Sequence, residues 1–177
     1  GADGIRPASL AGLAPALAPL ATLEASIGGR ARLTIDVERA RVERSWLDLT
    51  VGPGRIVRPE LPGGAVAFAG GRLVADYDPF AARLAIERFA LDLGGPTLEA
   101  TGSVEQLHLD PGLGASPVPL VIAADAVARN VPAAELDRLW PSDAARGGRE
   151  WVTENIQEGI VEEAHAEVKV NLRPDDL

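Results

Sequence analysis

The residues of this chain that are capable of chemistry are few and far apart. Its only histidines, His108 and His165, stand 57 positions apart, each among charged neighbours in a stretch that alternates as a strand does. A catalytic or metal-binding histidine pair would need the fold to bring them together, and no motif indicates that it does. We therefore expect solvent-exposed strand positions. Cysteine is absent, which excludes disulfides, thiolate nucleophiles and thiolate metal sites.

Five acidic residues offer carboxylate pairs for acid–base catalysis or calcium binding: Asp36, Glu38, Asp76, Asp78 and Asp110. None has the spacing of a calcium loop, and turn positions or polar strand faces explain them better. The sequence contains no nucleophile elbow, zinc-protease motif or phosphate-binding loop. We expect no catalytic residue, metal or cofactor and no enzymatic activity, since a hydrolase would require a nucleophile–base pair that cannot be named.

A basic group is formed by Arg30, Arg32, Arg39, Arg41 and Arg44. It could meet anionic lipid headgroups. Because Glu38 and Glu43 alternate with these arginines in the sequence, we favour a solvent-exposed face on which acidic and basic side chains form ion pairs.

Charge and length restrict the class of protein. The net charge is −9, with 11 basic and 10 acidic residues in 1–90 but 6 and 16 in 91–177, which argues against a nucleic-acid partner. The apolar fraction of 46% is enough for a core. No run approaches the ~18 apolar residues of a membrane span, and residue 1 is glycine in a chain without methionine. We expect a segment of a longer chain, whose membrane contact is made by parts outside it.

The elements that position these residues change at residue 30. Residues 1–29 read as a helical lead-in, with leucines at three- and four-residue spacing broken by Pro15 and Pro19. Residues 30–177 read as one β-rich module, in which apolar and polar residues alternate between short Gly/Pro turns. The alternation slips between Ile86 and Phe89, which predicts a bulge. The pattern predicts an antiparallel meander forming a curved sheet, apolar on one side and groove-like.

A helical insert is expected at 131–158, within the β-rich module. It carries Trp140 and Trp151, two of the three tryptophans, around a break at Pro141 and a weak Gly147-Gly148 step. Two interpretations are open: the tryptophans are anchors that hold the helix to the sheet, or they line a groove or meet a neighbouring repeat. We favour anchors, because large aromatic side chains stabilise a weak helix through packing.

The phrase Leu139-Trp140-Pro141, followed by Arg149-Glu150-Trp151-Val152, Asn155-Ile156 and Gly159, resembles a pattern of the AsmA-like superfamily. These are large Gram-negative cell-envelope proteins, and the likeness is nearest the YhdP-like and TamB-like branches. The order of earlier elements is also similar, from a Pro/Ala/Leu-rich lead-in to the Tyr77-Asp78 step. Gly147-Gly148 departs from the pattern, since better helix formers are expected there.

The resemblance implies a periplasmic module of a protein anchored in the inner membrane. Such a module carries phospholipid acyl chains in an apolar groove between inner and outer membranes, or supports outer-membrane homeostasis and biogenesis. Its partners would be those acyl chains and neighbouring β modules of the same chain. The groove candidates are the alternating apolar residues: Leu33, Ile35, Val37, Leu84, Ile86, Leu98, Leu120, Ile122, Val168 and Val170. The alternative is a structural or adhesive β-module, whose apolar face is closed by a second sheet and which holds no lipid.

Overall fold

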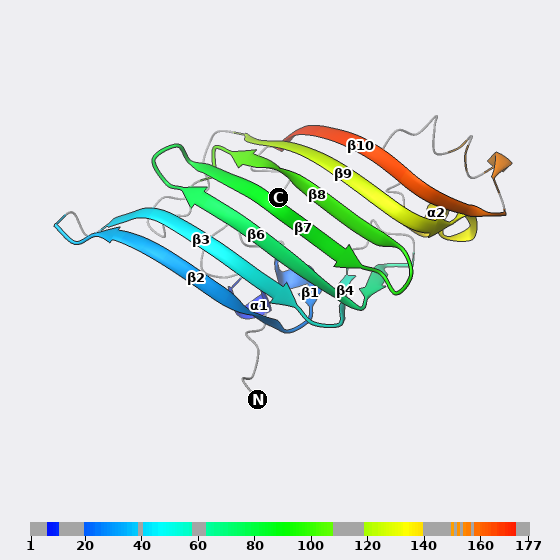
Figure 1. Ribbon diagram of the computed structural model, residues 1–177, viewed down its shortest axis with the longest axis horizontal. Helices are drawn as coiled ribbons and strands as arrows, with labels where there is room; N and C mark the ends of the chain where they lie inside the picture. The colour runs from blue at the N-terminus through cyan, green and yellow to red at the C-terminus, as the bar shows by residue number, and fades with distance from the viewer. Residues whose placement is uncertain are drawn as a thin grey trace.

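A computed structural model describes residues 7–10, 20–38, 41–57, 63–107, 119–139, 150, 152, 154–156 and 158–172. Within these residues the strands form two antiparallel sheets, one of seven strands and one of three. The large sheet has the order β10-β9-β8-β7-β6-β3-β2, so it is a meander along the chain (Figure 1). This confirms the mainly β, curved and open sheet that the period-two pattern predicts.

The strands of the large sheet are long. Their bounds are β2 Ile27–Asp36, β3 Arg41–Val51, β6 Gly70–Asp78, β7 Arg83–Asp92, β8 Thr97–Glu105, β9 Leu120–Pro132 and β10 Ile160–Leu172. Each strand pairs antiparallel with the one that follows it in the chain, except that β3 pairs with β6. The bulge expected after Ile86 is confirmed, since Ile86 pairs with Gly102 and Phe89 with Ala100.

The small sheet was not expected from the sequence. It consists of β1 Leu23–Glu24, β4 Gly54–Val57 and β5 Ala65–Phe68 in the order β1-β4-β5. It lies behind one end of the large sheet, where the chain passes from β3 into β4 and from β5 into β6 (Figure 1). The strands are too short, and their apolar residues too few, for periodicity to separate them from turns.

Buried side chains occur in both sheets of the described part of the chain. Val66 and Phe68 of β5 are buried, as are Ala75 and Tyr77 of β6. The Tyr77 hydroxyl donates a hydrogen bond of 2.9 Å to the Leu107 carbonyl oxygen, which ties β6 to the end of the β8 segment. Tyr77 lies toward the end of β6 that is far from the small sheet, because β5 leads into β6 at Gly70.

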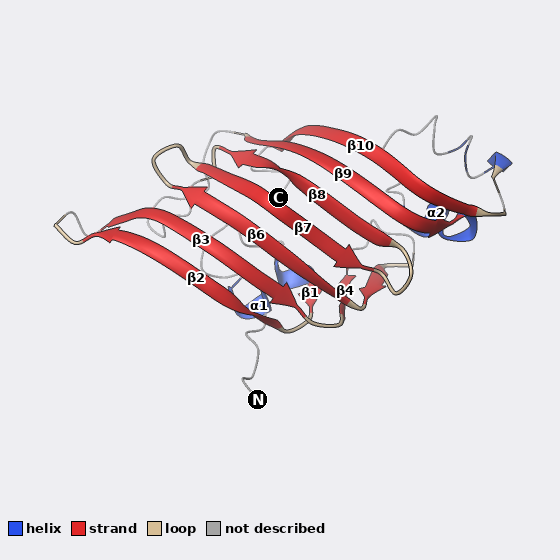
Figure 2. Ribbon diagram, in the orientation of Figure 1, coloured by secondary structure: helices blue, strands red, loops and turns tan. Residues whose placement is uncertain are grey.

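Helices are minor in the described residues (Figure 2). They include α1 Pro7–Leu10, a 3₁₀ turn at 20–22 and α2 Ala133–Leu139. Within the expected helical lead-in 1–29, β1 and the first residues of β2 are strands. They pair with β4 and β3, respectively. The insert expected at 131–158 begins at α2, since β9 continues to Pro132. Within the described residues, no helix is long and apolar enough to cross a membrane.

Candidate functional site

The pairing register separates the residues of the large sheet into two faces, because directly paired residues share a face. Leu47 pairs with Ala75 and Leu73 with Phe89, which carries one apolar face from β3 to β7. Leu98 pairs with Ala128 and Ile122 with Val170, which extends the same face to β10. We call this side the apolar face.

Nine of the ten groove candidates lie on the apolar face. Leu33 and Ile35 come from β2, Leu84 and Ile86 from β7, Leu98 from β8, Leu120 and Ile122 from β9, and Val168 and Val170 from β10. The tenth, Val37, lies in the turn after β2 and is 85% exposed, because the strand ends at Asp36. The alternation in the sequence therefore selects residues from five strands that the fold brings to one side.

Exposure on the apolar face is greatest on the two edge strands. Leu33 and Ile35 on β2 are 56% and 53% exposed, and Val168 and Val170 on β10 are 38% and 39% exposed. Leu84, Ile86, Leu98 and Ile122 on the inner strands are half-buried. Apolar surface is therefore accessible at both edges of the large sheet.

The opposite side of the sheet, which we call the charged face, carries cross-strand ion pairs. Arg44 of β3 meets Asp76 of β6 at 2.9 Å, and Arg72 of β6 holds Asp48 of β3 with two hydrogen bonds of 2.9 and 3.0 Å. Arg32 lies 5.7 Å from the ring centroid of Trp46. The contacts of Arg32 with Trp46 and of Arg44 with Asp76 support the interpretation of these arginines as members of an outer face of paired side chains.

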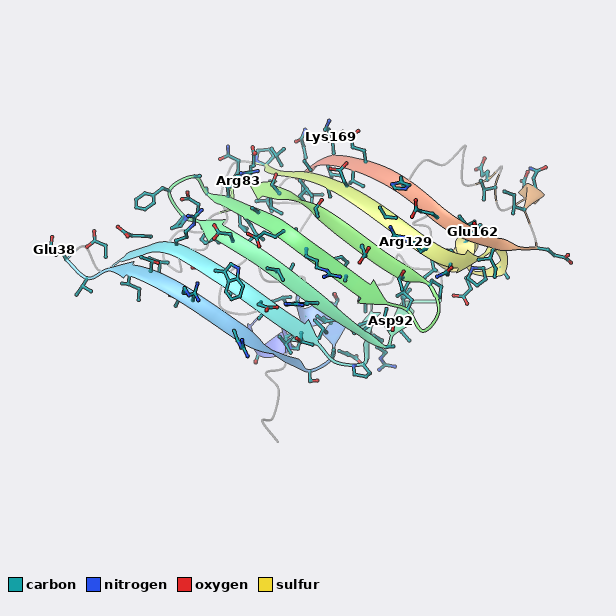
Figure 3. The ribbon with its side chains drawn as sticks, in the orientation of Figure 1. Glu38, Arg83, Asp92, Arg129, Glu162 and Lys169 are labelled. Carbon is teal, nitrogen blue, oxygen red and sulfur yellow. The ribbon has the colours of Figure 1, made fainter. Side chains whose placement is uncertain are left out.

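A second network on the charged face joins four strands. Arg88 of β7 reaches Glu99 of β8 at 3.4 Å, and Glu99 binds Arg129 of β9 at 2.8 Å. Arg129 also binds Glu163 of β10 at 2.9 Å, and Glu163 contacts His165 at 2.7 Å. Arg129 lies between β8 and β10 in Figure 3. A hollow of about 410 Å³ adjoins this network; Glu99 and Arg129 at its wall bind each other, and Arg72 binds Asp48.

Ion pairing shifts the pKa of two carboxyls. The His165 and Arg129 hydrogen bonds lower the pKa of Glu163, and the Arg72 hydrogen bond lowers that of Asp48. Glu163 is exposed and Asp48 is half-buried, and both shifts arise from ion pairing with a neighbouring strand or residue.

The other residues singled out in the sequence lie on strands or turns, or outside the described residues. Asp76 is held by Arg44, Asp78 accepts hydrogen bonds from the amides of Phe80 and Ala81 in a turn, and His165 is exposed on β10, as expected. Trp140 and Trp151, with His108 and Asp110, lie outside the described residues. In the part of the chain that the structure describes, no group of three or more histidine or acidic side chains is placed to hold a metal ion.

The pairing register also places on the apolar face several residues that are not among the groove candidates. The apolar face also carries Leu47, Leu49, Leu73, Phe89 and Leu91, with Ala124, Ala126 and Ala128 of β9 and Ala164 and Ala166 of β10. Their signal was the same alternation, interrupted by the bulge at Ile86. Comparison with known proteins found no matching family model, no matching curated protein and no matching solved structure.

Proposed function

We propose that this chain is a non-enzymatic groove module of the bacterial cell envelope, whose apolar face shelters phospholipid acyl chains. The observation that carries the proposal is one continuous apolar face across seven strands, opposite a face of ion pairs. Acyl chains are matched by apolar surface without directional polar groups, and aliphatic side chains provide that surface.

The resemblance to the AsmA-like superfamily supplies the setting of the proposal. A module of that kind works in the periplasm, between inner and outer membranes, and assists lipid transfer or outer-membrane homeostasis. The phrase around Trp140 and Trp151 carries the resemblance, whereas the acyl-chain role rests on the sheet. The two parts of the proposal therefore depend on different residues.

The rival function is a structural or adhesive module with a closed core. The burial of Val66 and Phe68 in the small sheet and of Tyr77 in the large sheet is the observation in its favour. However, the three small-sheet strands have two to four residues each, against nine to thirteen in the large sheet. A second layer of that size leaves the exposed residues of β2 and β10 uncovered, which favours a ligand-accessible face.

The experiment compares one substitution on each face. Val168 on the apolar face and Val121 on the charged face are both 38% exposed, so Val168→Asp and Val121→Asp are matched in residue type and exposure. Leu33→Asp provides a second apolar-face variant at the opposite edge. The readouts are phospholipid extracted from the purified chain and binding of a fluorescent phospholipid.

We expect a several-fold loss of bound lipid in Val168→Asp and Leu33→Asp and none in Val121→Asp, because a carboxylate against acyl chains loses its hydration. Circular dichroism checks that all three variants fold. Absence of phospholipid from the wild-type chain, or equal losses on both faces, would contradict the proposal and favour the closed structural module.

A further inference from the structure

The outer edge of β10 is open in the described part of the chain. β10 runs for 13 residues, pairs with β9 on one side only and is exposed at nearly every position, whereas β9 is mostly half-buried. β10 contains no proline, so each residue keeps its amide donor. A long, regular edge of this kind is a template for pairing with another strand.

The charges along β10 distinguish it from an edge protected by repulsion. On the charged face it presents Glu163, His165 and Glu167, followed by its one lysine, Lys169, which lies 2.7 Å from Glu167. Glu162 and Lys169 lie toward opposite ends of the strand in Figure 3. A strand whose charge changes sign along its length attracts an antiparallel copy of itself.

We propose that β10 is a self-association edge, at which two copies of this chain pair antiparallel about Ala166 to form one continuous sheet. This inference goes beyond the proposed function and does not depend on it. In this register, Glu163 stands opposite Lys169 of the second copy, and His165 stands opposite Glu167. Ile160 stands opposite Leu172, so the pairing spans the strand from end to end. On the apolar face, Ala164 meets Val168.

Neighbouring registers are worse for a physical reason. Moving the centre to His165 places Glu163 opposite Glu167, and moving it to Glu167 places that carboxylate opposite its own copy. Like charges directly opposite each other destabilise a strand pair, whereas opposite charges stabilise it. Moving the centre by one residue shifts the partner of each residue by two positions. Each face therefore stays on its own side, because side chains alternate with a period of two.

Sheet geometry limits the other ways in which two copies can join. A twofold axis normal to the sheet pairs β10 with β10, or β2 with β2, antiparallel and with faces matched. The β2 pairing would oppose the arginines Arg30 and Arg32, and β2 has a register shift after Thr34. A translation would pair β10 with β2 in parallel, since six antiparallel steps separate them. That contact is heterologous and leaves free edges, whereas the twofold pair is closed.

The first experiment measures oligomeric state by sedimentation. We expect the wild-type chain to have twice its 18.5 kDa monomer mass. Lys169→Glu replaces both Glu–Lys pairs with Glu–Glu pairs and should give monomer at the same concentration. Arg32→Glu makes the same charge change on β2 and should leave the dimer intact. A monomeric wild-type chain, or dissociation by Arg32→Glu in place of Lys169→Glu, would overturn the proposal.

The second experiment tests the register, because the chain has no native cysteine. Ala166→Cys places two thiols opposite each other across the axis, within the range that a disulfide spans. Val168→Cys places them four residues out of step, about 14 Å along the strands, where a disulfide cannot form. Mild oxidation should cross-link the first variant and spare the second. Equal cross-linking of both variants, or of neither, would rule out this register.

Discussion

At the scale of single residues, this protein uses its charged side chains for cross-strand pairing. Glu163 is held by His165 and Arg129, and Asp48 by Arg72, so both carboxyls have a lowered pKa. A carboxyl whose pKa is lower in the folded state stabilises that state above its unfolded pKa, and the contribution is lost as pH falls through the folded value. The ordinary values here are 4.5 and 3.8.

We predict an acid limb of stability that depends on these two groups. The midpoint of thermal unfolding should hold near neutral pH and fall as the pH drops below the ordinary pKa of glutamate. In Glu163→Gln/Asp48→Asn, the acid limb should be shallower, because the neutral side chains gain no charge-dependent stability on folding. The effect should be small and reduced by salt, since the pairs are exposed. Identical acid limbs measured by circular dichroism would contradict it.

Tyr77 provides a second prediction at this scale. Tyr77→Phe removes the donor to the Leu107 carbonyl oxygen and retains the ring, so the buried area hardly changes. We expect the free energy of unfolding in urea to fall by about 1–2 kcal/mol, because a buried acceptor loses its partner. An unchanged denaturation midpoint would show that water replaces the hydroxyl.

At the scale of elements, alternation predicted the strands well and their ends less well. The slip between Ile86 and Phe89 was visible in the sequence, because a bulge shifts the apolar set by one residue. The short strands β1, β4 and β5 were missed, since two to four residues are too few to show a period. Val37 continued the pattern of β2 but belongs to the turn that ends it.

Two glycines in strands test how closely neighbouring strands approach. A Cβ added to Gly102 of β8 would lie 2.8 Å from the Cα of Ala124 and against the carbonyl oxygen of Ala123, whereas one added to Gly28 of β2 meets nothing within 4 Å. Gly102→Ala should therefore lower the free energy of unfolding by about 1–3 kcal/mol. Gly28→Ala is the control and should be neutral or slightly stabilising. Equal effects of the two substitutions in urea denaturation would contradict the tight approach.

At the scale of the whole molecule, the open sheet leaves much surface in contact with solvent. The chain has 11457 Å² of accessible surface, whereas a compact monomer of its mass has about 8,200 Å². In the described part of the chain, the strands outside the large sheet are the three short ones of the small sheet. Edge strands on both sides of the large sheet add to the accessible surface (Figure 1).

This shape predicts a large radius of gyration. A compact chain of this length has a radius of about 16 Å, and we expect a clearly larger value for the monomer in small-angle X-ray scattering. Lys169→Glu should be used, so that pairing through β10 does not contribute. A radius at the compact value would show that the sheet closes in solution and would favour the structural module.

The sequence by itself determined the local properties of this protein. Alternation set which segments are strands and which side of each strand is apolar, because a strand exposes successive side chains to opposite faces. Alternation also identified nine residues that share one face. The order of residue types in β10 places Glu163 and Glu167 before Lys169.

Only the tertiary structure decided the rest. Strand order, register and the identity of β2 and β10 as edges depend on contacts between residues far apart in the chain, which no local pattern encodes. The same holds for the small sheet, in which β1 pairs with the distant β4. The chemistry of each face is therefore local in origin, whereas its continuity and accessibility come from how the strands pair.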